Sequence, residues 1–240
     1  MGERRVAFFD IDKTIYDGYL IFPLAEHFLA EGIVGNDTVE LLYRDLALYR
    51  SGREDYETTI ANFNSHFALG LGGCTADIVF AATERLVEGR EAGRFFAFAG
   101  PLTAMLGKTH DIYLVTGELQ FVGWAVAKHF SVKGFVSSVT EERDGVFTGV
   151  VTRSLARKED KASAIERLFK TYPRRGSMAF GDSEGDVEML GRVEHAFCIN
   201  ATEGLARVAL ERKWNVVTPL SIIEAVRPIL HGQEGTSPLS

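Results

Sequence analysis

Five short apolar segments, separated by stretches with helical spacing, constrain the fold of this 240-residue chain more than any other feature. Each has the length of a β-strand, and they begin at Val6, Asp111, Gly134, Ser177 and His195. Helix-forming stretches lie between or after them, over 120–130, 158–170, 185–190 and 203–213. Strands that alternate with helices predict a parallel sheet covered by helices on both faces. The expected fold class is therefore α/β, with a doubly wound parallel sheet.

A long segment directly after the first strand interrupts this alternation. From about residue 18 to residue 97 the sequence reads as nearly continuous amphipathic helix, as in LAEHFLAEGIV and ADIVFAATERLVEGR. We expect an inserted helical domain at 18–97 and a core that joins 1–17 to 98–230. The pair Asp144-Gly145, flanked by apolar residues, predicts a β-hairpin. The polar residues 231–240 are predicted to form a flexible tail.

The charge balance and the short apolar runs exclude several classes of protein. The chain has 26 basic and 33 acidic side chains and a formal net charge of −7, which argues against a nucleic acid as partner. No stretch approaches the roughly 18 apolar residues of a membrane span, and the first residues lack the apolar run of a signal peptide. Cys74 and Cys198 lack zinc-binding spacing. We expect a soluble, cytoplasmic protein, and no feature of the sequence specifies an oligomeric state.

Two carboxylates follow the first predicted strand in FFDIDKT. Asp10 and Asp12 are two positions apart, so in an extended segment their side chains lie on the same side. Neighbouring carboxylates repel each other unless a cation binds between them. The alternative is that they only cap the helix that follows, although one aspartate would suffice for that.

A second pair of carboxylates follows another predicted strand in GDSEGDVEML. Asp182 comes directly after the apolar run, and Asp186 would lie in the first turn of a helix. Taken alone, this cluster is equally typical of a solvated turn. Together with Asp10 and Asp12 it would form an oxygen-rich site at the carboxyl ends of two strands, which is the type of site that Mg²⁺ prefers.

Two further elements could contact a phosphate. Thr116-Gly117 ends the run DIYLV, and a hydroxyl beside a glycine amide can bind phosphate oxygens. Lys161 could offset negative charge that grows in a transition state. Neither is specific by itself, because a Thr-Gly pair can be an ordinary turn and a lysine at a helix start is commonly solvated.

In this order the four motifs resemble those of the haloacid dehalogenase superfamily, in its phosphatase branch and the phosphoserine-phosphatase-like group with a helical cap. The motifs are DIDKT, Thr116-Gly117, Lys161 and GDSEGD, and the resemblance spans nearly the whole chain. It implies that the insert at 18–97 is a cap that closes over the site. The presence of Asp12 argues against dehalogenase chemistry, because that branch of the superfamily lacks the second aspartate.

The resemblance also implies a role for each residue. Asp10 would attack phosphorus and form an aspartyl-phosphate, and Asp12 would protonate the leaving group and later activate water. Mg²⁺ would be held by the carboxylates of Asp10 and Asp182 and the backbone carbonyl of Asp12, with Asp186 in or near its ligand shell. The expected phosphate-binding residues are Thr14, Thr116, Gly117 and Lys161. The implied function is Mg²⁺-dependent hydrolysis of a small phosphorylated metabolite. The alternatives are a phosphotransferase with the same intermediate and a non-catalytic protein that binds a phosphorylated ligand.

Two departures from the group argue against phosphoserine as the substrate. Phosphoserine phosphatases usually carry a glutamate nine residues after the nucleophile, where this chain has Tyr19, and a Ser-Gly-Gly-Phe sequence where this chain has Thr-Gly-Glu-Leu. The predicted cap contains Arg44, Arg50 and Arg53 among Tyr43, Tyr49 and Tyr56. These residues either bind an acidic or ring-bearing part of the substrate or are solvated and packing residues of amphipathic helices.

Overall fold

A seven-stranded sheet forms the centre of the computed structural model, which describes residues 3–234. The strand order is β4-β3-β2-β1-β5-β6-β7, and all neighbouring strands are parallel except β3 and β4. The strands are β1 (Arg5–Phe9), β2 (His110–Leu119), β3 (Gly134–Arg143), β4 (Val146–Arg153), β5 (Met178–Gly181), β6 (His195–Ile199) and β7 (Asn215–Val217). This arrangement confirms the α/β fold expected from the alternating pattern.

Helices cover both faces of the sheet because successive side chains of its buried strands point to opposite faces. Ala7 and Phe9 of β1 belong to a core shared with α5 (Ala99–Leu106), α6 (Gln120–His129) and α10 (Ile222–Glu234). Val6 and Phe8 belong to a second core shared with α7 (Lys158–Glu166), α8 (Val187–Leu190) and α9 (Glu203–Arg212). Short 3₁₀ helices lie at η1 (Ala92–Arg94), η2 (Leu168–Lys170) and η3 (Glu184–Asp186).

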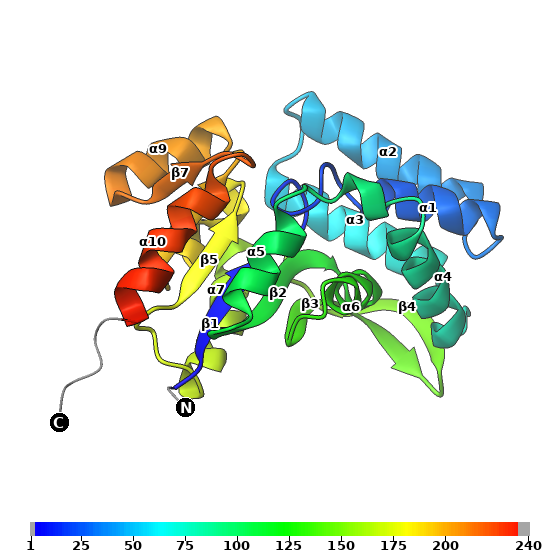
Figure 1. Cartoon of the computed structure of the whole chain (residues 1–240). Coiled ribbons are helices and arrows are strands. Elements are labelled where there is room, and N and C mark those ends of the chain that lie inside the picture. Colours follow the sequence, from blue (N-terminus) through cyan, green and yellow to red (C-terminus); the bar gives the residue numbers. More distant parts are fainter. Residues whose placement is uncertain (1–2, 235–240) are drawn as a thin grey trace.

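Four helices follow β1 and gather on one flank of the molecule (Figure 1). They are α1 (Ile21–Ala30), α2 (Asn36–Arg50), α3 (Tyr56–Gly70) and α4 (Ala76–Glu88). The Asp55 side chain accepts a hydrogen bond from the Thr58 N–H and caps α3, as expected for an aspartate at that position. Phe28 and Phe67 from these helices pack against Phe121 of α6, so the four helices share the core of the sheet.

All five strands expected from apolar runs are present, and so is the hairpin between β3 and β4. Asp144 and Gly145 both adopt positive φ, at 51° and 78°, as a tight hairpin turn requires. The predictions missed β7, α5 and α10. Pro228 lies inside α10, and an internal proline argues against a helix in a sequence pattern.

The C-terminal end differs in part from the expected flexible tail. Helix α10 continues to Glu234, which is inside the segment 231–240, and residues 235–240 lie outside the described residues. Within 3–234, no helix is both long and apolar enough to cross a membrane.

Candidate active site

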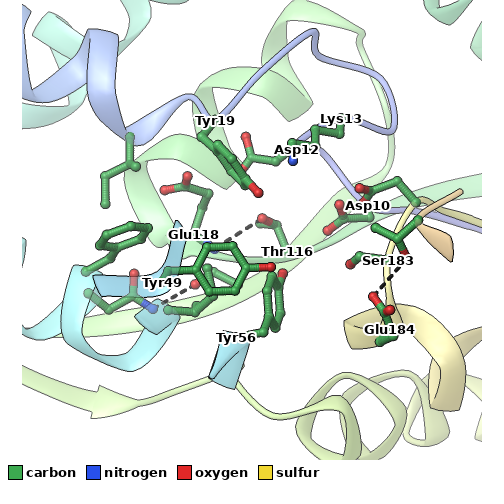
Figure 2. Close-up of a pocket in the computed structure, with 17 residues that line it drawn as sticks. Asp10, Asp12, Lys13, Tyr19, Tyr49, Tyr56, Thr116, Glu118, Ser183 and Glu184 are labelled. Carbon is green, nitrogen blue, oxygen red and sulfur yellow. Dashed lines mark hydrogen bonds between the residues drawn. The ribbon is translucent and has the colours of Figure 1, made fainter. Parts of the chain in front are cut away.

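Three neighbouring strands bring the predicted motifs together. Because β1 pairs with both β2 and β5, the carboxyl ends of all three lie at the same edge of the sheet. Asp10, Thr116 and Asp182 line one pocket at this edge, together with residues of the helical segment (Figure 2). The full lining is Asp10, Asp12, Lys13, Tyr19, Ile21, Tyr49, Tyr56, Ile60, Phe63, Asn64, Thr116, Gly117, Glu118, Asp182, Ser183, Glu184 and Thr202.

The loop after β1 turns back on itself and directs both aspartates toward the pocket. Lys13 adopts a left-handed conformation with φ of 55°, which is unfavourable by about 1–2 kcal/mol for a residue other than glycine. The Asp12 carboxylate lines the pocket and also accepts a hydrogen bond of 2.9 Å from the Leu20 N–H at the start of α1. Asp12 therefore does cap the following helix, whereas Asp10 does not serve that purpose and instead contacts Lys161 at 2.7 Å.

The loop after β5 forms a capping box that fixes Asp186. The Ser183 hydroxyl accepts a hydrogen bond from the Asp186 N–H, and the Asp186 carboxylate accepts one from the Ser183 N–H. The same carboxylate oxygen, Oδ2, also accepts from the Asp182 N–H at 3.1 Å. Asp186 is fully buried, so the solvated-turn interpretation does not hold for this residue.

Gly181 leaves the space that the Asp186 side chain occupies. A Cβ at position 181 would come within 2.6 Å of three Asp186 atoms. We expect Gly181→Ala to lower the free energy of unfolding by about 1–3 kcal/mol, because a well-packed core tolerates an added methyl group poorly. Urea denaturation measures this. In the matched control Gly100→Ala the new Cβ would meet nothing within 4 Å, so an equal loss in both variants would contradict the prediction.

Lys161 joins the two loops by buried ion pairs. Its Nζ lies 2.7 Å from Asp10 Oδ1 and 2.8 Å from Asp186 Oδ1, and the side chain is 5% exposed. Burial disfavours the ammonium, but the Asp10 and Asp186 carboxylates outweigh it and hold the pKa of Lys161 well above its usual value. Lys161 is therefore not the solvated lysine of the alternative interpretation.

The carboxylates outnumber the cations at this edge. Oxygens of Asp10, Asp182 and Asp186 lie within 4.8 Å of one another, and all three residues are buried. Burial raises the pKa of Asp10 to about 7, although the Lys161 ammonium lowers it. The pKa of Asp182 is raised well above its usual value, mainly by burial and next by the negative charge of Asp186. A bound divalent cation would relieve this repulsion, and carboxylate oxygens are the ligands that Mg²⁺ prefers. The residues present therefore fit a magnesium ion.

The two oxygens of Asp186 are already engaged, by Lys161 on one side and by backbone N–H groups on the other. Asp10 and Asp182 both line the pocket, which leaves them as the carboxylates more open to a cation. In this geometry Asp186 orients Lys161 and the Asp182 loop.

The predicted phosphate-binding residues are distributed unevenly. Thr116 and Gly117 line the pocket, and the Thr116 hydroxyl accepts a hydrogen bond of 3.1 Å from the Glu118 N–H (Figure 2). Lys161 lies beside Asp10, outside the pocket lining. Thr14 is fully buried, is not part of the lining, and its hydroxyl has no hydrogen-bond partner among the described residues.

A comparison with known families agrees with this arrangement. Residues 7–191 match the family of haloacid dehalogenase-like hydrolases, and the match includes all the motifs described above. The chain belongs to this family. Membership of the haloacid dehalogenase-like hydrolases confirms the resemblance that the four motifs indicated.

Two relatives in Mycobacterium tuberculosis are phosphatases by name. The phosphoserine phosphatase SerB1 is 27% identical over 219 residues, which are 88% of this chain and 69% of the relative. A protein named probable phosphatase Rv3661 is 25% identical over 232 residues, which are 93% of this chain and 79% of the relative. Their names agree with the phosphatase branch of the family.

Solved structures share the fold. A protein of unknown function from Bordetella pertussis Tohama I has a TM-score of 0.75 at 21% identity and covers 91% of this chain and 100% of its own. A substrate-bound phosphoserine phosphatase has a TM-score of 0.62 at 15% identity and covers 86% of this chain and 91% of its own.

Several pocket residues of this haloacid dehalogenase-like hydrolase had no predicted role. Tyr49 and Tyr56 were noted only with the arginines, and Asn64 and Phe63 come from a helix that no motif marked. The position of Glu118 in the pocket could have been predicted, because Glu118 is two positions after Thr116 and alternate residues of a strand lie on the same face.

The arginines of the helical segment lie outside this pocket. Arg44 is 58% exposed and contacts Asp45, and Arg50 and Arg53 are exposed as well. None of the three is part of the pocket lining, whereas Tyr49 and Tyr56 are. The described geometry thus favours the solvated interpretation for the arginines and the substrate-facing one for the two tyrosines.

Proposed function

We propose that this chain is a Mg²⁺-dependent phosphomonoester hydrolase that transfers a phosphoryl group from a small metabolite to Asp10 and then to water. The observation that carries the proposal is the position of Asp10. It directly follows the central strand β1 and lines the pocket. Its carboxylate is paired with Lys161 at 2.7 Å, and one of its oxygens lies within 4.8 Å of an Asp182 oxygen. A carboxylate so placed is suited to nucleophilic attack on phosphorus.

In the first step the Asp10 carboxylate forms a bond to phosphorus while the bond from phosphorus to the ester oxygen breaks. Asp12 gives its proton to the leaving oxygen, so the product departs as a neutral alcohol. In the second step Asp12 takes a proton from water, the water oxygen bonds to phosphorus, and Asp10 is released. The Lys161 ammonium stays on Asp10 Oδ1, where it offsets the negative charge of the transferring group.

The environment of Asp12 suits an acid that must hold a proton. Burial, and then the neighbouring Glu118 carboxyl group, raises the pKa of Asp12 well above its usual value. A raised pKa favours the protonated form near neutral pH, which is the form that the first step requires.

Mg²⁺ would be held by the carboxylates of Asp10 and Asp182 and the backbone carbonyl of Asp12, with Asp186 holding Lys161 and the Asp182 loop in position. When bound, the ion would neutralise charge between the anionic nucleophile and the anionic phosphate. Thr116 and Gly117 are proposed to bind phosphate oxygens from the end of the neighbouring strand β2, and Thr14 to support the loop after Asp12.

The segment 18–97 is proposed to act as a cap over this pocket. Tyr49, Tyr56 and Asn64 reach the pocket from α2 and α3, and the Tyr56 ring packs against Gly185 of the Asp182 loop. A cap of this kind excludes water from the reacting groups and contacts the leaving group.

The exposed arginines of the proposed cap should contribute little. We expect Arg44→Ala, Arg50→Ala and Arg53→Ala each to keep kcat/KM within about twofold of wild type, because a solvated side chain outside the pocket stabilises no transition state. Steady-state kinetics on the best metabolite and on a small aryl phosphate measures this. A tenfold loss confined to the metabolite would contradict the prediction and show that the arginine contacts the substrate.

The proposal is tested by a screen of phosphorylated metabolites in the presence of Mg²⁺, with release of inorganic phosphate as the readout. Turnover of at least one small ester is expected. Added alcohols distinguish a hydrolase from a phosphotransferase, because a phosphotransferase would form a new phosphate ester in place of inorganic phosphate. Binding of phosphorylated ligands without turnover would refute the enzyme assignment and support a non-catalytic protein.

A further inference from the structure

One carboxyl group in the pocket acts in the chemistry described above only through its effect on the pKa of Asp12. Glu118, from the end of β2, is 7% exposed and lines the pocket beside Asp12 and Tyr19 (Figure 2). Its carboxylate oxygen Oε2 is buried and has no hydrogen-bond partner among the described residues. An unpaired buried carboxylate oxygen is costly, so it indicates a place where a ligand donates.

The position of Glu118 relative to Asp12 identifies the part of the substrate that it would meet. Both carboxyl groups line the pocket, and Glu118 lies close enough to Asp12 to raise its pKa. Asp12 would contact the ester oxygen, whereas Asp10 would contact phosphorus. Glu118 therefore lies on the leaving-group side of the pocket, a short carbon chain away from the ester oxygen.

Apart from Asn64, the part of the lining that comes from residues 19–64 is apolar or aromatic. It is formed by Tyr19, Ile21, Tyr49, Tyr56, Ile60 and Phe63. The one basic side chain in the described lining is Lys13, whose ammonium lies 4.3 Å from the centre of the Tyr19 ring. Aromatic faces and a carboxylate attract a cation, so Lys13 is the one side chain of the described lining that would attract a second anion.

We propose that Glu118 determines specificity by binding an ammonium group on the leaving alcohol, so that the substrate is the phosphate monoester of a short amino alcohol without a carboxylate. This inference rests on the proposed phosphatase function. The ammonium donates to Oε2 and lies among the aromatic rings. A substrate such as phosphoserine would also bring a carboxylate next to Glu118 and Asp12, which would repel it, and the one cation of the described lining, Lys13, lies over the Tyr19 ring.

The test compares two esters of nearly equal size, 2-aminoethyl phosphate and propyl phosphate, which differ in the terminal ammonium or methyl group. We expect wild type to have a kcat/KM at least about tenfold higher for the aminoethyl ester, the size of one charged hydrogen bond. Phosphoserine should be turned over less well than the aminoethyl ester. The absence of a preference for the aminoethyl ester would overturn the inference.

The decisive variant is Glu118→Gln, which keeps the shape of the side chain but removes its charge. We expect its loss on the aminoethyl ester to exceed its loss on the propyl ester by about tenfold to a hundredfold, because any effect on the pKa of Asp12 is common to both esters. Glu118→Asp, which keeps the charge, should retain part of the preference. The matched control Glu142→Gln removes an exposed carboxylate from β3 and should change neither ratio.

Equal losses of Glu118→Gln on both esters would overturn the inference, because they would mean that Glu118 only positions Asp12 or the start of α1. If wild type hydrolyses propyl phosphate without preferring the ammonium, the inference fails while the proposed function stands. If wild type releases phosphate from no ester in the wider screen, the proposed function itself fails, and the inference with it.

Discussion

Asp10→Asn should lower kcat by at least about a thousandfold while the protein still folds, because an amide cannot serve as the nucleophile. The fold should survive, since Lys161 keeps its second partner, Asp186, at 2.8 Å. Hydrolysis of a generic aryl phosphate measures the loss, and circular dichroism checks the fold.

The matched control is Asp17→Asn, which changes an exposed aspartate on the same loop and should leave turnover within about twofold. Residual activity of Asp10→Asn above about one per cent of wild type would remove Asp10 from the nucleophilic role, since loss of a covalent nucleophile costs several powers of ten.

Removal of divalent metal should lower activity by at least about a hundredfold, because the buried cluster of Asp10, Asp182 and Asp186 carries more negative charge than Lys161 can offset. Added Mg²⁺ should restore the activity. Ca²⁺ should inhibit, since it takes more oxygen ligands and could engage both oxygens of Asp10, so that the nucleophile is no longer free.

Dialysis against a chelator, followed by titration with each cation, measures this dependence. Asp182→Asn should raise the Mg²⁺ concentration needed for half-maximal activity by about tenfold or more, since it removes one proposed ligand. Full activity after dialysis, or an unchanged Mg²⁺ requirement in Asp182→Asn, would contradict the metal assignment.

The sheet and the strand-end residues could be predicted because both depend on local pattern. Buried parallel strands require continuous apolar runs, and polar residues after such runs lie at the edge where ligands bind. Asp10, Asp12, Thr116 and Asp182 were found in this way, and all four line the pocket. The family resemblance supplied the roles that the pattern alone left open.

The contacts between the helical segment and the sheet could not be predicted from local pattern. Tyr56 and Asn64 reach the pocket only because α3 packs over the end of β2, where the Asn64 amide donates to the Gly117 carbonyl at 2.8 Å. Nothing in the spacing of either residue distinguishes it from the rest of an amphipathic helix. Arg44, Arg50 and Arg53 were candidate substrate contacts because of their charge, but charged side chains lie at the surface more often than in a pocket.

The covalent intermediate on Asp10 can be trapped during turnover. Borohydride reduces an acyl phosphate to an alcohol, so quenching the enzyme with borohydride while it hydrolyses its substrate should convert the Asp10 side chain to that of homoserine. Peptide mass spectrometry then identifies the position. We expect this modification at Asp10 only with substrate and Mg²⁺ present, and we expect none in Asp10→Asn. An unmodified Asp10 in an enzyme quenched at full turnover, or modification of a different carboxylate, would show that Asp10 is not the nucleophile.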